Sequence, residues 1–206
     1  MKKTLIGIID YGFGNLGSIK NTLEILGYKI LISNSANEID QSDLIILPGV
    51  GAYRSAMLTL ETTGLSDYLV SAGAHGKPIL GICLGMQLLV TQSSEFGETL
   101  GLNLIPGTVN QLDQHTHIGW NQLKIVSKDD LFKAQKDKFF YFNHSFYVET
   151  NDTYTTCFVR QYSNSKPFCV GIRDENIVGV QFHPEKSQLN GQKFLDILIK
   201  GLVNDK

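Results

Sequence analysis

Two stretches of the chain hold residue types that could form a nucleophilic site. The first is Gly81-Ile82-Cys83-Leu84-Gly85, in which a cysteine lies between two glycines at the end of an apolar run. The second is His183-Pro184-Glu185, which places a carboxylate two residues after an imidazole. Pro184 predicts extended backbone here, in which both side chains point to the same side. A carboxylate that holds one ring nitrogen leaves the other to act on a thiol, and the resulting thiolate can attack a carbonyl carbon. Together the two stretches predict a Cys–His–Glu site for acyl transfer.

The glycines around Cys83 predict a sharp turn from a buried strand into a helix. Side chains two residues either side of the cysteine would collide in such a turn, which explains glycine at both positions. We expect the sulfur at the helix N-terminus, where partial positive charge favours the thiolate. On the same helix, Gln87 would follow Cys83 by one turn and Glu95 would lie near the helix end. A buried structural cysteine in a tight turn is the alternative interpretation.

Strands and helices that alternate along the first half of the chain would position this turn. Apolar runs predict strands at 5–9, 29–32, 43–47 and 79–82, with helices between them, the first at 18–26. This order is typical of parallel strands joined by right-handed crossovers, with helices on both faces of the sheet. Shorter strands predict an antiparallel extension of the same sheet, and a last helix is expected at 191–202; those strands are 104–109, 120–126, 139–142, 154–159, 168–172 and 177–182.

Composition narrows the class of protein. The chain has 206 residues, which suits one α/β domain spanning 1–206, and its net charge of −2 gives no footprint for nucleic acid or an anionic membrane. Its three cysteines are unevenly spaced, so we expect free thiols and the cytoplasm. The apolar run after Lys3 ends at Asp10 and is too short for a targeting segment, and no run is long enough to span a membrane.

Two glycine-rich loops fall at carboxyl ends of the expected parallel strands, where ligands bind in such sheets. Residues 10–17 match the G-x-G-x-x-G pattern of dinucleotide sites. Because Ser33-Asn34-Ser35 stands where that site needs a ribose-binding acid, we favour a turn that packs under the active site. The second loop, Pro48-Gly49-Val50-Gly51, could direct a backbone N–H of Val50 or Gly51 inward. With the Leu84 N–H, it would complete an oxyanion hole.

Several motifs together resemble a known family, the triad-type (class I) glutamine amidotransferases, and within it the glutaminase subunits of imidazole glycerol phosphate synthase. The turn around Cys83 and His183-Pro184-Glu185 are typical of the superfamily. The resemblance extends over the whole chain through Asp10-Tyr11-Gly12-x-Gly14-Asn15-Leu16, Pro48-Gly49-Val50-Gly51-Ala52, Gly101-Leu102-x-x-Ile105-Pro106-Gly107, Gly119-Trp120-Asn121, Tyr141-Phe142-x-His144-Ser145 and Gln181-Phe182-His183-Pro184-Glu185-Lys186-Ser187.

The resemblance implies a flavodoxin-like glutaminase fold without cofactor or metal, in which Cys83, His183 and Glu185 form the catalytic triad. It also implies that ammonia from glutamine passes to a separate (β/α)₈-barrel cyclase subunit, with which the chain forms a heterodimer. By the same analogy, the oxyanion hole is incomplete until the partner binds. The implied glutamine pocket consists of Gly51, Gln87, Glu95, His144, Ser145 and Phe146, and the expected interface residues are Asn15, Trp120 and Lys186.

Three alternatives remain open at this level. Departures from the family pattern, such as Thr116-His117-Ile118-Gly119 in place of Pro-His-Met-Gly, allow a paralogue that supplies ammonia to a surface-polysaccharide sugar. The chain could also be a catalytically silent binding module with Cys83 as a redox sensor. Finally, Asp113, His115 and His117 alternate along an expected strand and could ligate a metal on one face.

Overall fold

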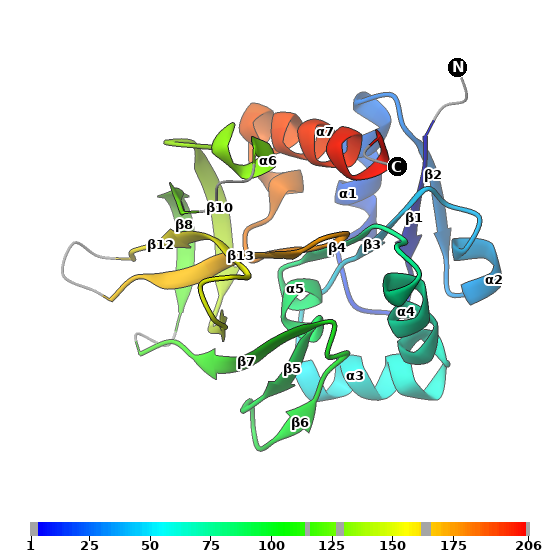
Figure 1. Cartoon of the computed structure of the whole chain (residues 1–206), viewed down its shortest axis with the longest axis horizontal. Helices are drawn as coiled ribbons and strands as arrows, with labels where there is room; N and C mark the ends of the chain where they lie inside the picture. Colours follow the sequence, from blue (N-terminus) through cyan, green and yellow to red (C-terminus); the bar gives the residue numbers. More distant parts are fainter. Residues whose placement is uncertain (1–3, 114–115, 127–129, 162–165, 205–206) are drawn as a thin grey trace.

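The main sheet of the protein has eight strands, in the order β2-β1-β3-β4-β14-β13-β12-β9. Figure 1 labels β1, β2, β3, β4, β13 and β12 of this sheet. The computed structural model describes residues 4–113, 116–126, 130–161 and 166–204. The parallel part comprises β1 Leu5–Ile9, β2 Lys29–Ser33, β3 Leu44–Leu47, β4 Ile79–Ile82 and β14 Ile177–Val180. The remaining strands pair antiparallel with their neighbours: β13 Phe168–Asp174, β12 Thr155–Val159 and β9 Lys124–Ile125.

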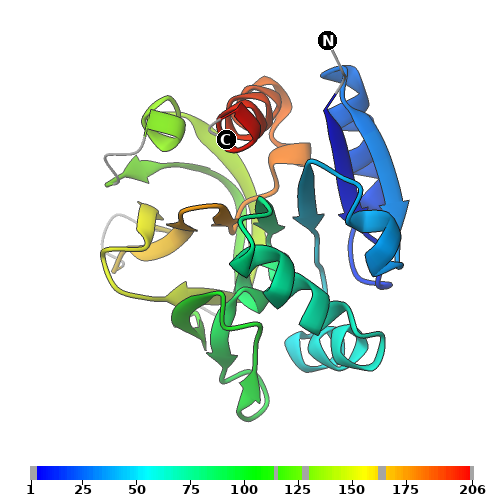
Figure 2. The same cartoon turned by 45° about the vertical axis from the view of Figure 1, so that its right-hand side comes forward.

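Helices cover both faces of this sheet, as Figures 1 and 2 show. Alternate residues of the strands point to opposite faces, so Ile8 and Ile46 belong to one buried cluster, and Ile9 and Leu47 belong to the other. The first cluster includes side chains of α1 Leu16–Ile25 and α7 Gln188–Asn204. The second includes side chains of α3 Tyr53–Thr62, α4 Leu65–Ala74 and α5 Leu84–Leu88. The prediction of a mainly parallel sheet between helices is confirmed.

The predicted antiparallel extension is only partly right. β13, β12 and β9 extend the main sheet, but β14 lies parallel to β4. Two smaller sheets contain the other late strands. One has the order β11-β7-β5-β6, and the other pairs β10 with β8. Their bounds are β5 Val90–Ser93, β6 Thr99–Leu100, β7 Ile105–Gln111, β8 His117–Gln122, β10 Phe139–His144 and β11 Phe146–Glu149.

The helix after Cys83 is shorter than predicted. It ends at Leu88, and β5 follows at once, so Glu95 lies beyond a strand and not near a helix end. The carbonyl of Leu88 accepts the N–H of Leu102, and the carbonyl of Leu89 accepts the N–H of Leu104. Carbonyls that would continue the helix are therefore bonded to the chain that leads into β7.

Short helices make up the remaining regular structure. They are α2 Ala36–Ile39, α6 Asp130–Lys133 and the 3₁₀ turn η1 Pro184–Lys186. Gly64, with φ of 72°, separates α3 from α4. Within the described part of the chain, none of these helices has the length and hydrophobicity needed to cross a bilayer.

Candidate active site

Cys83 occupies the turn between β4 and α5 with φ of 56° and ψ of −111°. Such a conformation in a residue other than glycine costs about 1–3 kcal/mol and occurs mostly at functional sites. A Cβ on Gly81 would come within 2.6 Å of the Gly85 carbonyl oxygen, and one on Gly85 would overlap the Leu47 carbonyl. The steric reason for both glycines is confirmed. Because α5 has only five residues, however, its dipole contributes less to the sulfur than a long helix would.

His183 and Glu185 meet behind this turn. Nδ1 of His183 lies 2.8 Å from Oε1 of Glu185, and both side chains are buried. A carboxylate can only accept, so Nδ1 carries the proton and Nε2 is left to act on the sulfur. The expected extended backbone at Pro184 is wrong, because residues 184–186 form the 3₁₀ turn η1. This tight turn brings the Glu185 carboxylate back onto the imidazole that precedes it.

The pKa of His183 reflects two opposed influences. Burial lowers this pKa because it penalises the charged ring, but hydrogen bonds and charge interactions with Cys83 and Glu185 outweigh burial and raise it to about 10. The imidazole is therefore held in its protonated form between a carboxylate and the sulfur. This arrangement places a positive charge beside the candidate nucleophile, which suits thiol chemistry at Cys83.

The loop after β3 lies against the start of α5. The carbonyl of Gly49 accepts the N–H of Leu84 at 3.4 Å. Because Gly49 C=O and Val50 N–H belong to the same trans peptide, the Val50 N–H points away from Leu84. A Cβ on Gly49 would lie 2.7 Å from that of Leu84, so the close approach requires glycine. The structure thus has a carbonyl where an oxyanion hole would need a donor.

The glycine-rich loop of residues 10–17 packs against the loop that follows β3. The Tyr11 hydroxyl donates to the Pro48 carbonyl at 2.7 Å, and a Cβ on Gly14 would lie 3.0 Å from the Pro48 ring. Asn15 caps α1 by accepting the Ser18 N–H. The interpretation of this loop as a packing turn is confirmed, and Asn15 remains exposed at its edge.

A cavity of about 350 Å³ brings nearly all the predicted site residues together. Glu185 lies behind His183, while Asn15 and Trp120 are outside the lining. Sequence reasoning did not assign Asn143 to the pocket. The full lining consists of Val50, Gly51, Cys83, Leu84, Gln87, Glu95, Asn143, His144, Ser145, Phe146, His183 and Lys186.

Hydrogen bonds hold two polar side chains of this cavity, Glu95 and His144, in place. Oε2 of Glu95 accepts the Tyr53 N–H at the start of α3 at 2.9 Å. His144 bonds through Nδ1 to the Phe146 carbonyl at 2.8 Å and through Nε2 to Nδ1 of His117 at 2.9 Å. Burial is the main cause that lowers the pKa of His144 to about 3 and that of His117 to about 4. Both rings are therefore neutral at physiological pH.

The metal hypothesis for Asp113, His115 and His117 loses support. His117 is buried against His144, whereas Asp113 lies exposed in a turn before β8. His115 falls outside the described residues. Among those that are described, no group of three or more His, Cys, Asp or Glu side chains is arranged to hold a metal ion.

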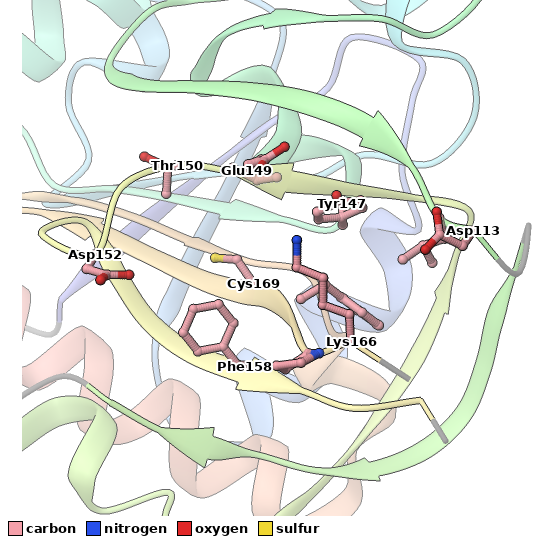
Figure 3. Close-up of a pocket in the computed structure, with 12 residues that line it drawn as sticks. Asp113, Tyr147, Glu149, Thr150, Asp152, Phe158, Lys166 and Cys169 are labelled. Atoms are coloured by element: carbon pink, nitrogen blue, oxygen red, sulfur yellow. The ribbon is translucent and has the colours of Figure 1, made fainter. Parts of the chain in front are cut away.

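A second cavity, of about 240 Å³, is lined by residues of β11, β12 and β13 and shares no lining residue with the first (Figure 3). Cys169 lines it from β13, and Phe158 lines it from β12. Burial raises the pKa of Cys169 to about 11 and that of Cys157 well above its usual range. Both thiols therefore stay protonated at neutral pH, which makes them poor nucleophiles.

Sequence reasoning gave no role to Gln181, which contacts Cys83. Its Nε2 lies 3.6 Å from Sγ of Cys83, and its Oε1 accepts Nε2 of Gln87 at 3.0 Å. The available signals were its place two residues before His183 in a buried strand pattern and at the start of a family motif. Its contacts with Gln87 and Cys83 depend on tertiary packing.

Comparisons with known proteins agree with this geometry. A family model described as glutamine amidotransferase class-I matches residues 7–199. A relative from Listeria monocytogenes, named imidazole glycerol phosphate synthase subunit HisH, is 45% identical and covers 94% of this chain and 93% of its own. One with the same name from Methanothermobacter thermautotrophicus is 41% identical, covering 94% and 96%.

Solved structures share the fold. The structure of PurLQS from Thermotoga maritima has a TM-score of 0.78 at 20% identity, covering 98% of this chain and 100% of that one. A glutamine amidotransferase from the same organism has a TM-score of 0.74 at 15% identity, covering 98% and 99%. The predicted fold class is confirmed. The chain belongs to the class-I glutamine amidotransferases and, within them, to the family of the imidazole glycerol phosphate synthase subunit HisH.

Proposed function

We propose that this protein hydrolyses glutamine to glutamate and ammonia as the glutaminase subunit of imidazole glycerol phosphate synthase, in histidine biosynthesis. One observation carries the proposal: a single cavity gathers Cys83, His183 and the residues expected to bind glutamine. The names of the relatives favour histidine biosynthesis over sugar amination. The intact pair of His183 and Glu185 argues against a catalytically silent module.

In the proposed reaction the Cys83 thiolate attacks the side-chain amide carbon of glutamine. A C–S bond forms, and the π electrons of the carbonyl move to its oxygen. The C–N bond then breaks as protonated His183 gives its proton to the departing ammonia, which leaves a thioester. Neutral His183 takes a proton from water, the hydroxide attacks the thioester, and glutamate leaves as the sulfur regains its electron pair. Glu185 holds the imidazole in the correct tautomer throughout.

The negative oxygen of the tetrahedral intermediate requires donors, for which we assign the N–H groups of Leu84 and Val50 or Gly51. The bond from Leu84 N–H to the Gly49 carbonyl fits a resting state in which this hole is incomplete. Rotation of the peptide between Gly49 and Val50 would remove the carbonyl and present the Val50 N–H.

The remaining lining fits glutamine. The Glu95 carboxylate is nine-tenths buried and suits the α-ammonium group of the substrate. Gly51 allows close approach of the backbone, while Gln87 offers its amide from α5. We assign the opposite wall to His144, Ser145 and Phe146, which lead from β10 into β11.

The partner we propose is a (β/α)₈-barrel cyclase subunit that forms a heterodimer over the cavity mouth. Trp120 is 46% exposed on β8 and packs edge-on against Tyr141, with 6.1 Å between ring centroids. Nζ of Lys186 lies 6.0 Å from the centre of the same Tyr141 ring. With Asn15 across the site, these side chains supply aromatic and cationic contacts for a partner. We treat residues 1–206 as one amidotransferase domain that acts in the cytoplasm, where its free thiols would persist.

Replacement of Cys83 by alanine tests the function. The assembled synthase should lose glutamine-dependent product formation and retain ammonia-dependent formation, because only ammonia release needs the thiol. Cys169→Ala is the matched control and should leave glutamine-dependent turnover nearly unchanged. Glutamine hydrolysis at the wild-type rate by the Cys83→Ala complex would refute the assignment.

A further inference from the structure

We propose that Gln181 is a catalytic residue whose side-chain N–H stabilises the Cys83 thiolate; the inference rests on the proposed role of Cys83 as nucleophile. Nε2 of Gln181 approaches Sγ of Cys83 at 3.6 Å, within the range of an N–H···S hydrogen bond. Gln181 is completely buried and does not line the glutamine cavity. It can therefore reach the sulfur but not the substrate.

The direction of this hydrogen bond follows from a chain of fixed donors and acceptors. The Phe146 carbonyl can only accept, and Gln87 approaches it at 3.1 Å, so the group of Gln87 that faces it is Nε2. The same Nε2 lies 3.0 Å from Gln181, which must therefore present its oxygen. The nitrogen of Gln181 is then left to face the sulfur.

The opposite orientation of the Gln181 amide is disfavoured at both ends. It would place two NH₂ groups against each other at Gln87 and a carbonyl oxygen against the sulfur of Cys83. That oxygen would repel a thiolate, whereas the N–H attracts it. The anchor itself is firm, since the Phe146 carbonyl also accepts Nδ1 of His144 at 2.8 Å.

The thiolate gains more from this donor than the thiol does. A donor to a charged acceptor in a buried site is stronger than one to a neutral acceptor. Protonated His183 and the Gln181 N–H would thus share the sulfur charge, one by ion pairing and one by a neutral dipole. The dipole persists when His183 gives up its proton, so it would also stabilise the sulfur as the thioester breaks down.

Two variants separate this role from simple packing. Gln181→Met fills a similar volume but lacks the donor. Gln181→Glu keeps the shape and the acceptor for Gln87 but turns an oxygen toward the sulfur. Gln135→Met is the matched control, because Gln135 is also buried and its Nε2 has no hydrogen-bond partner among the residues that the structure describes.

The first measurement is the pH dependence of iodoacetamide alkylation at Cys83 in the full chain, followed by peptide mass spectrometry so that the other two cysteines do not interfere. We expect the midpoint to move upward by about one pH unit in Gln181→Met, a tenfold loss of thiolate, and further in Gln181→Glu. Gln135→Met should keep the wild-type profile. A role in packing alone would not give this order, since glutamate preserves the shape better than methionine.

The second measurement is glutamine turnover by the assembled synthase, with ammonia-dependent synthesis as the check on folding and assembly. At pH values below the alkylation midpoint, kcat should fall about tenfold in Gln181→Met, and it should approach the wild-type value as pH rises above that midpoint, with KM for glutamine within about twofold of wild type. Unchanged alkylation profiles and kcat in both variants would overturn the inference, as would a change confined to KM. If the Cys83→Ala complex still hydrolyses glutamine, the proposed function fails. If Cys83→Ala is inactive but both Gln181 variants behave like the wild type, only the present inference fails.

Discussion

Replacement of Val50 by proline removes the N–H that the oxyanion hole is expected to use. In the structure this N–H points away from Leu84, because the Gly49 carbonyl accepts the Leu84 N–H. The Val50 side chain is 44% exposed, so its loss alone should change stability little. Gly49 also tolerates the extended conformation that a following proline imposes.

Two free energies decide whether the peptide between Gly49 and Val50 can rotate: the cost of breaking its hydrogen bond and the gain from a new oxyanion donor. The bond from Leu84 to Gly49 is 3.4 Å long, beyond the usual range of about 2.7–3.2 Å, so breaking it should cost no more than about 1 kcal/mol. An oxyanion donor is worth about 2.7–4 kcal/mol in the transition state. The donor therefore stabilises the transition state by more than the rotation costs, so the peptide can rotate during turnover. A chain without this N–H should lose about 100- to 1,000-fold in kcat.

Steady-state glutamine hydrolysis by the partner-stimulated complex is the assay, with Val50→Ala as the control that keeps the N–H. We expect Val50→Ala to stay within about threefold of wild type and Val50→Pro to show the full loss, with KM nearly unchanged. Ammonia-dependent synthesis should survive in both. A stimulated Val50→Pro complex as fast as Val50→Ala would show that this N–H is not an oxyanion donor.

Burial lowers the pKa of His183, but Cys83 and Glu185 raise it to about 10, above the value of 6.5 for an unperturbed histidine. Protonation of this ring therefore stabilises the folded state. The stabilisation is complete below pH 6.5 and is lost as pH rises through about 10. In Glu185→Gln this loss should occur at lower pH, as urea unfolding across that range would measure. Gly85→Ala should destabilise the fold by about 2 kcal/mol or more, seen as a lower Tm, because its Cβ would overlap the Leu47 carbonyl. Trp120→Ala should weaken partner binding about tenfold or more by calorimetry without lowering the Tm of the isolated chain; equal affinity would move the interface elsewhere.

Local chemistry explains which features the sequence predicted. The turn at Cys83 was predictable in part from local sterics, because a Cβ on Gly81 would collide with the Gly85 carbonyl oxygen four residues later. The collision at Gly85 is with the Leu47 carbonyl of β3, so it depends on the neighbouring strand. The contact of His183 with Glu185 was also predictable, since the two lie so close in the chain that either an extended or a 3₁₀ backbone can join them. The backbone between them was nevertheless predicted wrongly. The period of apolar residues likewise indicated the parallel strands and the two faces that they bury.

Only tertiary structure decided how the later strands pair. A short apolar run can pair with several other strands. The local sequence does not indicate that β14 lies parallel to β4 or that β7 belongs to a separate sheet. The end of α5 was likewise decided by tertiary structure. The helix stops because the carbonyls of Leu88 and Leu89 accept the N–H groups of Leu102 and Leu104, which lie much further along the chain. Pairing energy from remote segments outweighed the helix propensity of the stretch.

The surroundings of the sulfur were decided in the same way. Cys83 immediately precedes α5 and Gln87 lies within it, whereas Phe146 begins β11 and Gln181 follows β14. The direction of the hydrogen bonds among them exists only once these three parts of the fold are in place. The sequence alone indicated the candidate nucleophile and its candidate base, because their signals are local spacings. The orientation of the amide that faces the nucleophile was decided by packing, since an isolated glutamine side chain has no preferred direction until donors and acceptors surround it.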